Sequence, residues 1–227
     1  MTPSWQTGDP WTDGLNMLVL GKTQTGKTSL CRELHDTSPR LSVWLNATGA
    51  DRVEDVPGRT VRSLSALQDA LRDDCWAIEW VSDDRRRDYP RLQRLQFELA
   101  DATDRSLRQQ TIVDEAHELA PTGRQSQDSQ LYDSQQTARR FAKRGVKRGI
   151  KHVAVTQDPT AMDSQTMRQS EHRVVFDMTS ENRKSSVLKR MGFDWDAVDA
   201  GDRFTGVLFD DSGQIEERAV KAQEEYA

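Results

Sequence analysis

The sequence has few cysteines and no long apolar run. Cys31 and Cys75 are the only two among 227 residues, so a disulfide framework is not expected and a reducing compartment is the default. No apolar stretch approaches the roughly 18 residues that a membrane-spanning helix needs. Residues 1–5 lack the basic and apolar segments of a signal peptide, so we expect a cytoplasmic protein without a transmembrane segment.

Lysine is also scarce. The chain has 8 Lys against 24 Arg, and 12 Glu against 25 Asp. This composition is typical of proteins from high-salt, high-GC organisms. Codon bias alone explains the arginine excess as well, but it explains the aspartate excess less well. The net charge is −5, so any contact with nucleic acid must come from local clusters of cations and not from a field of the whole protein.

One segment has the pattern of a phosphate-binding loop, the Walker A motif. Residues 21–28 read GKTQTGKT, between an apolar strand expected at 16–20 and a helix expected at 27–35. Gly21 and Gly26 let the backbone N–H groups face the phosphates. Lys27 reaches the β- and γ-phosphates, and the Thr28 hydroxyl binds Mg²⁺. The sequence therefore predicts an ATP and Mg²⁺ site. Its predicted nucleotide-binding residues are Gly21, Lys22, Thr23, Gln24, Thr25, Gly26, Lys27, Thr28 and Ser29.

A second lysine, Lys22, lies inside this loop. In some P-loop dimers an extra lysine reaches across to the nucleotide of the partner, which leaves a dimeric nucleotide switch open as a function. A solvated loop lysine is the simpler interpretation.

A second motif is a short apolar strand that ends in two acids. Residues 111–113 are followed by Asp114 and Glu115, about 85 residues after the loop. This is the pattern of a Walker B strand. Asp114 is expected to hold the water shell of Mg²⁺, and Glu115 to orient or deprotonate the attacking water. The tetrapeptide DEAH also occurs in one class of helicases, but those enzymes use two such domains and this chain is too short for two.

A third strand, expected at 151–156, ends in Thr156 and Gln157. Ligands of open α/β sheets bind at the carboxyl ends of the strands. Gln157 is therefore expected to sense the γ-phosphate or the attacking water. The alternative is an ordinary strand-end glutamine, which would be preferred without the other two motifs.

The remaining pattern alternates strands with helices. Further strands are expected at 41–46, 75–81 and 173–176, and helices at 65–72, 88–101, 138–147 and 180–191. Residues 203–209 and 214–220 are expected to form a terminal hairpin that turns at 211–213. We therefore predict an α/β fold with a mainly parallel sheet covered by helices on both faces. The chain length favours a single domain over 1–227, with its core at about 15–210.

Taken together, these motifs resemble those of the HerA/FtsK superfamily of P-loop ATPases. The resemblance rests on GKTQTGKT, then IVDEAHELAP, then GIKHVAVTQDP, and it extends over residues 15–210. It implies a RecA-like core and a homo-oligomer, usually a hexameric ring with ATP sites between subunits.

The sequence departs from this family at one position. Family members commonly carry, eleven residues before the strand-end glutamine, an arginine that acts on the ATP of the neighbour. Here the position is Val146. Arg148 and Arg144 are the candidates for the role, with Arg168 a third. Arg139 and Arg140 lie close by, and this basic run can equally be a solvated helix face or a contact to DNA phosphates.

Two further features stay open. The polar segment 122–136 is expected to be an exposed loop that passes into a helix, and it either touches a DNA backbone in a central channel or binds nothing. Trp5 and Trp11 precede the first strand and either stack on the adenine or cap the edge of the sheet, the latter being favoured.

The function predicted from these features is an ATP-driven motor that moves double-stranded DNA. A bare core without appended domains resembles the genome-packaging ATPases of archaeal or bacterial viruses, and the composition suggests a haloarchaeal host. A virion or membrane protein is a possible docking partner. The alternatives are an ATPase that powers protein secretion, conjugation or virion assembly, and the dimeric switch.

Overall fold

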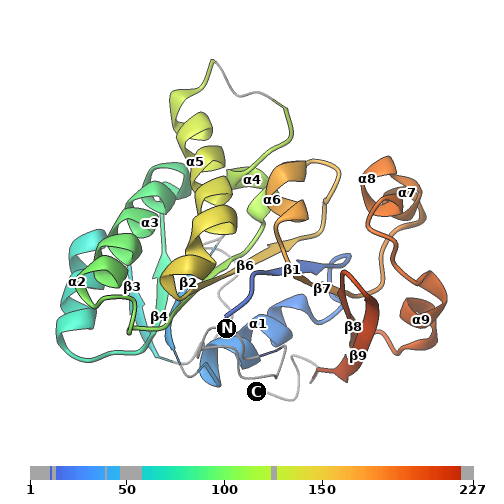
Figure 1. Cartoon of the computed structure of the whole chain (residues 1–227), viewed down its shortest axis with the longest axis horizontal. Coiled ribbons are helices and arrows are strands. Elements are labelled where there is room, and N and C mark those ends of the chain that lie inside the picture. Colours follow the sequence, from blue (N-terminus) through green and yellow to red (C-terminus); the bar gives the residue numbers. More distant parts are fainter. Residues whose placement is uncertain (1–10, 12–13, 39, 47–57, 124–126, 221–227) are drawn as a thin grey trace.

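A nine-stranded sheet runs through the described part of the molecule (Figure 1). The computed structural model describes residues 11, 14–38, 40–46, 58–123 and 127–220. In spatial order the strands are β3-β4-β2-β5-β6-β1-β7-β8-β9. From β3 to β7 neighbouring strands are parallel, and β8 and β9 are antiparallel. The strands are β1 (Met17–Leu20), β2 (Leu41–Asn46), β3 (Arg59–Val61), β4 (Ala77–Val81), β5 (Gln109–Val113), β6 (Ile150–Thr156), β7 (His172–Val175), β8 (Thr205–Asp210) and β9 (Gly213–Ala219).

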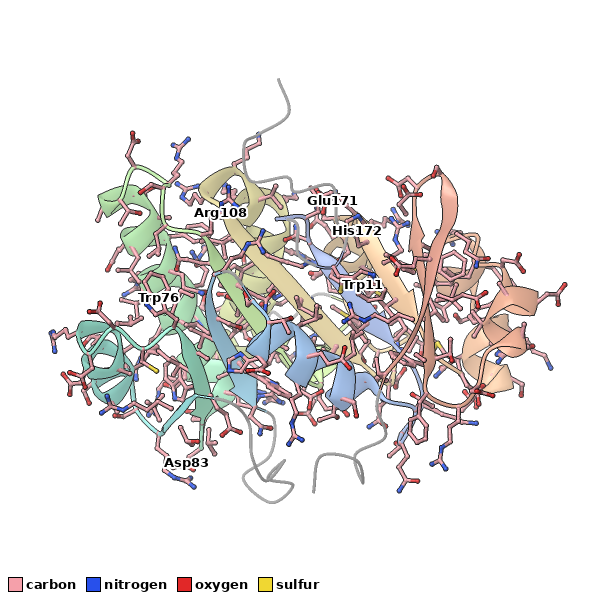
Figure 2. All side chains as sticks on the ribbon, turned by 90° about the horizontal axis from the view of Figure 1, so that it is seen from below. Trp11, Trp76, Asp83, Arg108, Glu171 and His172 are labelled. Atoms are coloured by element: carbon pink, nitrogen blue, oxygen red, sulfur yellow. The ribbon has the colours of Figure 1, made fainter. Side chains whose placement is uncertain are left out.

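Helices cover both faces of this sheet, but unequally (Figures 1 and 2). Helix α1 packs on one face, and α2, α3 and α5 pack on the other. Because side chains alternate along a strand, Met17 and Val19 contact the α1 side, while Leu18 and Leu20 belong to the larger core on the opposite side. The helices are α1 (Lys27–Asp36), α2 (Leu64–Arg72), α3 (Arg85–Ala102), α4 (Ala116–Leu119), α5 (Ser129–Arg140), α6 (Ser164–Arg168), α7 (Ser180–Lys184), α8 (Ser186–Lys189) and α9 (Trp195–Ala200).

The predicted fold class is confirmed: the chain forms a mainly parallel α/β sheet with helices on both faces and a C-terminal hairpin. The predicted turn lies between β8 and β9, where the Asp210 carboxylate accepts hydrogen bonds from the Ser212 and Gly213 N–H groups at 2.7 and 3.1 Å. Gly213 has φ +126, a conformation that favours glycine. Strand β3 was not predicted, since its 3 residues are too few to show a period.

Two predicted helices are wrong in their extent. The helix expected over 138–147 ends at Arg140 and continues as a π-helical turn, Phe141–Gly145, and a 3₁₀ turn, Val146–Arg148. The helix expected over 180–191 is interrupted at Ser185, which has an extended ψ of 143°. The Ser185 hydroxyl accepts the N–H of Leu188 and so begins α8 as a new helix. Helices α4, α6 and α9 were not predicted either.

Candidate nucleotide site

The loop between β1 and α1 has the backbone that a phosphate cradle needs. Gly26 immediately precedes α1 with φ +101, and a Cβ atom there would lie 2.6 Å from Val220. At Gly21 a Cβ would lie 2.7 Å from the Thr25 hydroxyl oxygen and 2.8 Å from Phe176 Cβ. Both positions therefore require glycine, and the first turn of α1 presents its N–H groups toward the loop.

Lys27 lies within this loop. Its side chain is buried, and its amine donates a hydrogen bond to the carbonyl oxygen of Lys22 at 2.7 Å. The Thr25 hydroxyl donates to the same oxygen at 2.9 Å. Burial lowers the pKa of the Lys27 amine, and the nearby carboxylates Glu115 and Asp114 oppose that shift. An added anion between the amine and the loop N–H groups would offset the burial cost, so the cradle fits a phosphate group.

The outer side of the loop is held by the C-terminal part of the chain. Lys22 forms an ion pair with Asp177, and its N–H donates to the Asp177 carbonyl at 2.9 Å. Arg203 donates to the backbone and side-chain oxygens of Gln24 at 2.9 and 2.8 Å. Lys22 is thus ion-paired within its own chain, whereas the simpler interpretation expected a solvated lysine.

The two acids after β5 point into the same region. The Asp114 carboxylate accepts the N–H of Glu115 at 2.9 Å, and Glu115 has a left-handed backbone with φ 45°. Burial raises the pKa of both carboxyl groups, and the charge of Asp114 adds to the shift at Glu115. A bound cation would stabilise this pair of buried acids. The described residues hold no cluster of three or more His, Cys, Asp or Glu that could bind a metal. Mg²⁺ does not require one, since it takes few protein ligands and completes its shell with water and phosphate.

His117 connects these acids to the neighbouring strand. Its Nδ1 atom lies 2.9 Å from the Thr156 hydroxyl oxygen and 3.3 Å from Glu115 Oε2. The 3.3 Å contact does not have hydrogen-bond geometry, and within the described residues this buried oxygen has no hydrogen-bond partner. One lone pair of Glu115 is therefore left for a water molecule.

Gln157 directly contacts the phosphate loop. Strand β6 pairs with β1 so that Thr156 lies beside Leu20, which brings the next residues of both strands together. The Thr23 hydroxyl donates to the Gln157 side-chain oxygen at 2.6 Å. The amide of Asn182 donates to the Gln157 carbonyl at 3.2 Å. Two of the predicted motifs are thus in hydrogen-bond contact, and Glu115 of the third approaches the β6 strand end through His117.

Arg85 is a site residue that the sequence did not reveal. It begins α3 after β4, its side chain is only 7% exposed, and it donates a hydrogen bond to the backbone carbonyl of Asp114. A second guanidinium nitrogen contacts Glu118 at 3.2 Å. Arg85 therefore holds the turn that carries the two acids. Its only sequence signal was the run of three arginines at 85–87, which has no spacing that points to a nucleotide site.

The candidate arginines lie at the other edge of the sheet. Arg148 precedes β6, where its Nε lies 3.4 Å from Asp101 and its guanidinium stacks 4.7 Å from the Phe97 ring centre. Arg144 is exposed on the π-helical turn, and Arg168 is exposed at the end of α6. None of the three approaches the loop of its own chain, so the role on a neighbour's ATP stays a prediction.

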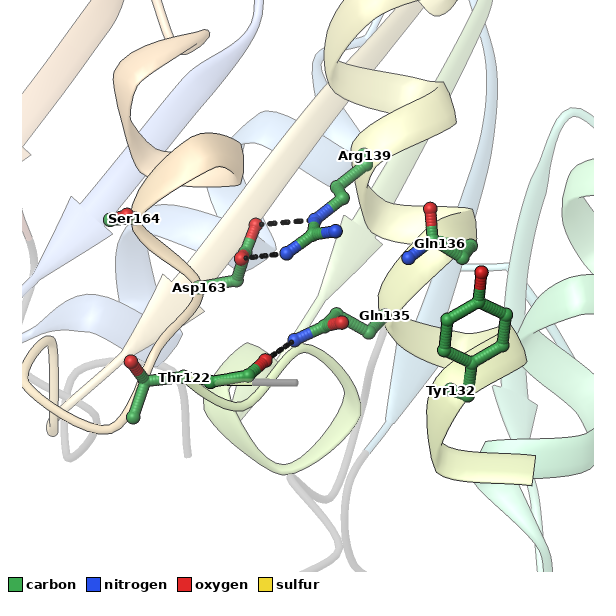
Figure 3. Close-up of a pocket in the computed structure, with 8 residues that line it drawn as sticks. Thr122, Tyr132, Gln135, Gln136, Arg139, Asp163 and Ser164 are labelled. Atoms are coloured by element: carbon green, nitrogen blue, oxygen red, sulfur yellow. Dashed lines mark hydrogen bonds and ion pairs between the residues drawn. The ribbon is translucent and has the colours of Figure 1, made fainter. Parts of the chain in front are cut away.

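The polar segment at 122–136 passes into α5, as expected, and borders a pocket of about 520 Å³ (Figure 3). At its base, Arg139 makes a paired contact with Asp163 at 2.7 and 3.2 Å. The Gln135 amide donates to the carbonyls of Pro121 and Gly123. Arg139 is thus a structural arginine that ties α5 to the segment after β6.

Trp11 packs against the sheet (Figure 2). Its indole N–H donates to Glu216 of the edge strand β9 at 2.8 Å, and its carbonyl accepts from Lys151 at 2.8 Å. This favours the role of a cap over adenine stacking. Trp5 lies outside the described residues. Both cysteines are free thiols, as predicted. Over the residues described, no helix combines the length and apolar character needed to cross a membrane.

Comparison with known proteins finds no matching family model and no similar curated protein. Solved structures are similar. The genome packaging NTPase B204 from Sulfolobus turreted icosahedral virus 2, in complex with ATP-gammaS, has a TM-score of 0.61 at 11% identity, over 94% of this chain and 98% of that one. VirB4 of Thermoanaerobacter pseudethanolicus has a TM-score of 0.61 at 11% identity, over 93% and 91%. The pCW3 conjugation coupling protein TcpA has a TM-score of 0.57 at 12% identity, over 92% and 61%.

These similarities concern the fold. The chain has the RecA-like fold of the packaging and conjugation proteins, so the resemblance predicted from three motifs is confirmed at that level.

Proposed function

We propose that the chain is an ATPase that binds ATP with Mg²⁺ between subunits and uses hydrolysis to move double-stranded DNA. The observation that carries this proposal is the contact between Thr23 of the phosphate loop and Gln157 at the end of β6. It joins the residues that hold a phosphate to a side chain able to respond to its removal, and Glu115 lies on the next strand over.

The roles in the site follow from the contacts. Residues 21–29 cradle the phosphates, and Lys27 exchanges its bond to the Lys22 carbonyl for one to a phosphate oxygen. Thr28 and Asp114 would hold Mg²⁺, which supplies positive charge against the phosphate oxygens when bound. Glu115 orients a water molecule and accepts its proton through the carboxylate oxygen that no described residue hydrogen-bonds. Arg85 holds the turn that carries this carboxylate, and His117 lies beside it.

The choice of DNA as substrate has two supports. B204 from Sulfolobus turreted icosahedral virus is described as a DNA-packaging ATPase, and its structure covers 92% of this chain. The fold also occurs in conjugation proteins such as TcpA. We therefore propose genome packaging by a homo-oligomeric ring, hexameric in the simplest case, with Arg148 acting on the neighbour's ATP. Each chain then acts as one domain in the host cytoplasm or at the virion.

The test is ATP hydrolysis with and without duplex DNA at moderate salt. We expect DNA to stimulate the wild type, and Glu115→Gln to abolish hydrolysis while it retains ATP. Turnover that does not respond to duplex DNA would argue for an ATPase that acts on protein. Absence of hydrolysis in the wild type would overturn the enzymatic proposal itself.

The dimeric switch is the weaker alternative. Lys22 is paired with Asp177 of its own chain, so a role on a partner's nucleotide would require that ion pair to break. Native mass measured with and without ATP separates the cases, since a switch gives a dimer that depends on nucleotide and a motor gives a ring.

A further inference from the structure

A one-sided row of cations lies where α5 passes into β6. We call it the basic stripe, and it consists of Arg140, Lys143, Arg144 and Lys147. All four side chains are exposed, whereas Phe141, Ala142 and Gly145 between them are buried. The burial pattern of residues 140–147 therefore separates a charged side, which faces solvent, from an apolar side, which faces the core.

The stripe is anchored to the rigid core. Its backbone is a π-helical turn followed by a 3₁₀ turn, so its outer side is defined by burial and not by α-helical spacing. The inner side is fixed by Phe141, whose ring stacks on His152 and on Tyr89 with ring centres 5.1 and 5.6 Å apart. The four exposed cations thus lie on the solvent side of this turn.

The positive charge of the stripe is not compensated. None of its members forms an ion pair with a residue that the structure describes, although adjacent arginines do. Arg139 binds Asp163 and Arg148 binds Asp101, so these two acids are already engaged by arginines beside the stripe. In a chain of net charge −5, a stripe of one sign is an exception that favours an anionic partner.

The arrangement fits a polyanion better than a second copy of the chain. An exposed acidic region around α9 carries Asp194, Asp196 and Asp202. The preceding helices carry Lys184, Lys189 and Arg190, so that surface is of mixed sign. The stripe extends about 10 Å at ~1.5 Å per residue, and a DNA strand presents a phosphate about every 3.4 Å along the axis.

We propose that the basic stripe binds the phosphate backbone of double-stranded DNA without reading its sequence. This inference rests on the proposed function, and it assigns the surface through which that function meets its substrate. The stripe adjoins the start of β6, whose other end carries Gln157, about 20 Å away at ~3.3 Å per residue. DNA and nucleotide thus contact opposite ends of one strand.

The experiment compares the full chain with the triple variant R140Q/K143Q/K147Q. Arg144 is left unchanged because it is a candidate for the trans-acting arginine. The matched control is K184Q/K189Q/R190Q, which removes the same charge from the exposed ends of α7 and α8. The affinity for a labelled duplex of random sequence is measured by fluorescence anisotropy over a series of salt concentrations, with ATP-γS and Mg²⁺ present. Native mass and the thermal midpoint are recorded for each protein.

We expect the triple variant to lose at least about tenfold in affinity at low salt, and its log–log salt slope to fall by up to ~2.7 per contacting subunit, since each lost contact accounts for about 0.9. The control should bind as the wild type does, and the thermal midpoints should agree.

Three results would overturn the proposal. One is an unchanged affinity and slope in the triple variant. Another is an equal loss in the control, which would indicate only a general charge effect. The third is a change of native mass with the salt slope preserved, which would assign the stripe to a contact between subunits. If the wild type binds duplex DNA through the stripe but does not hydrolyse ATP, the stripe stands and the proposed motor function fails.

Discussion

The cationic side chains at the two edges of the central sheet differ in whether they are bonded or exposed. At the carboxyl edge, Lys22 pairs with Asp177, Lys27 bonds a loop carbonyl, and Arg85 holds the acid turn. At the amino edge, the basic stripe is exposed and unpaired among the described residues. At the carboxyl edge the cations fix the geometry of a site. At the amino edge Arg148 and Lys151 are engaged, and the basic stripe is left to solvent.

The difference indicates two kinds of anion binding. A buried, oriented cation in a fixed cradle recognises one phosphate group in one position, which hydrolysis requires. Exposed cations on flexible stems bind any part of a repeating phosphate chain, which movement along DNA requires. Strand β6 joins the two, with Lys151 near one end and Gln157 beyond the other.

The largest effect is expected at the carboxyl edge. Lys27→Ala and Glu115→Gln should each lower the rate of ATP hydrolysis at least about 100-fold, because each removes a group that acts on the reacting phosphate or water. The exposed Lys184→Ala serves as the matched lysine control and should stay near the wild-type rate. Steady-state phosphate release measures all three. Hydrolysis that survives in Lys27→Ala would remove the basis for a distinction between the edges.

The next largest effect is expected for His152 in strand β6, and it concerns the free energy of unfolding. His152 is fully buried, and burial lowers its pKa to about 3 from an ordinary 6.5. The unfolded chain therefore takes up a proton below pH 6.5 that the folded chain does not. The stability that the neutral His152 contributes is therefore fully present above pH 6.5 and is lost as the pH falls toward 3. Between pH 8 and pH 5 the loss is about 2 kcal/mol.

His152→Gln tests this expectation, since an amide can replace the contact to the Tyr89 hydroxyl at 2.8 Å. Denaturant unfolding at both pH values should show that the variant loses about 2 kcal/mol less than the wild type over this range. Equal losses in the two proteins would mean that His152 is already accessible to protons in the folded state.

The contact between Thr23 and Gln157 should give a smaller effect. In a double-mutant cycle with Thr23→Val and Gln157→Ala, we expect a coupling free energy of about 1 kcal/mol in the activation of ATP hydrolysis, the usual magnitude for one hydrogen bond. Additive effects of the two changes would show that the contact does not persist with nucleotide bound.

The smallest effect is expected for Lys22→Ala. Its ion pair with Asp177 is partly exposed, at 46% and 38% of the two side chains, and such pairs contribute about 0–1 kcal/mol. The turnover number should therefore change by less than about fivefold, as such an energy implies. A loss as large as that of Lys27→Ala would instead support a lysine that acts on a partner's nucleotide.

The site was predictable where its residues are neighbours in sequence. The phosphate loop is a continuous motif, and Asp114 and Glu115 follow a buried strand, so the local pattern was enough. The prediction of Gln157 also required the rule that parallel strands end at the same edge of a sheet. The register of β1 with β6, in which Leu20 lies beside Thr156, agrees with that rule. The placement of Arg148 and Arg144 on a neighbouring subunit's site could not be derived from one chain.

Arg85 and His117 were missed for a physical reason. Arg85 reaches the site because α3 begins beside the end of β5, and its contact is to a backbone carbonyl that every residue possesses. His117 was visible only as part of a tetrapeptide, and its partner Thr156 lies 39 residues away. Likewise the π-helical turn after Arg140 coincides with the packing of Phe141 on His152, a contact between residues 11 apart that no local propensity records.

The sequence by itself determined the fold class, the phosphate loop and the acid pair, because glycines, an apolar period and adjacent charges act over a few residues. Only the tertiary structure decided which cations are engaged and which are available. An arginine or lysine has the same charge wherever it stands, and its role depends on whether the folded chain brings a carboxylate or a carbonyl within reach. That is why Arg139 ties α5 to the segment after β6, while Arg140, the next residue, faces solvent.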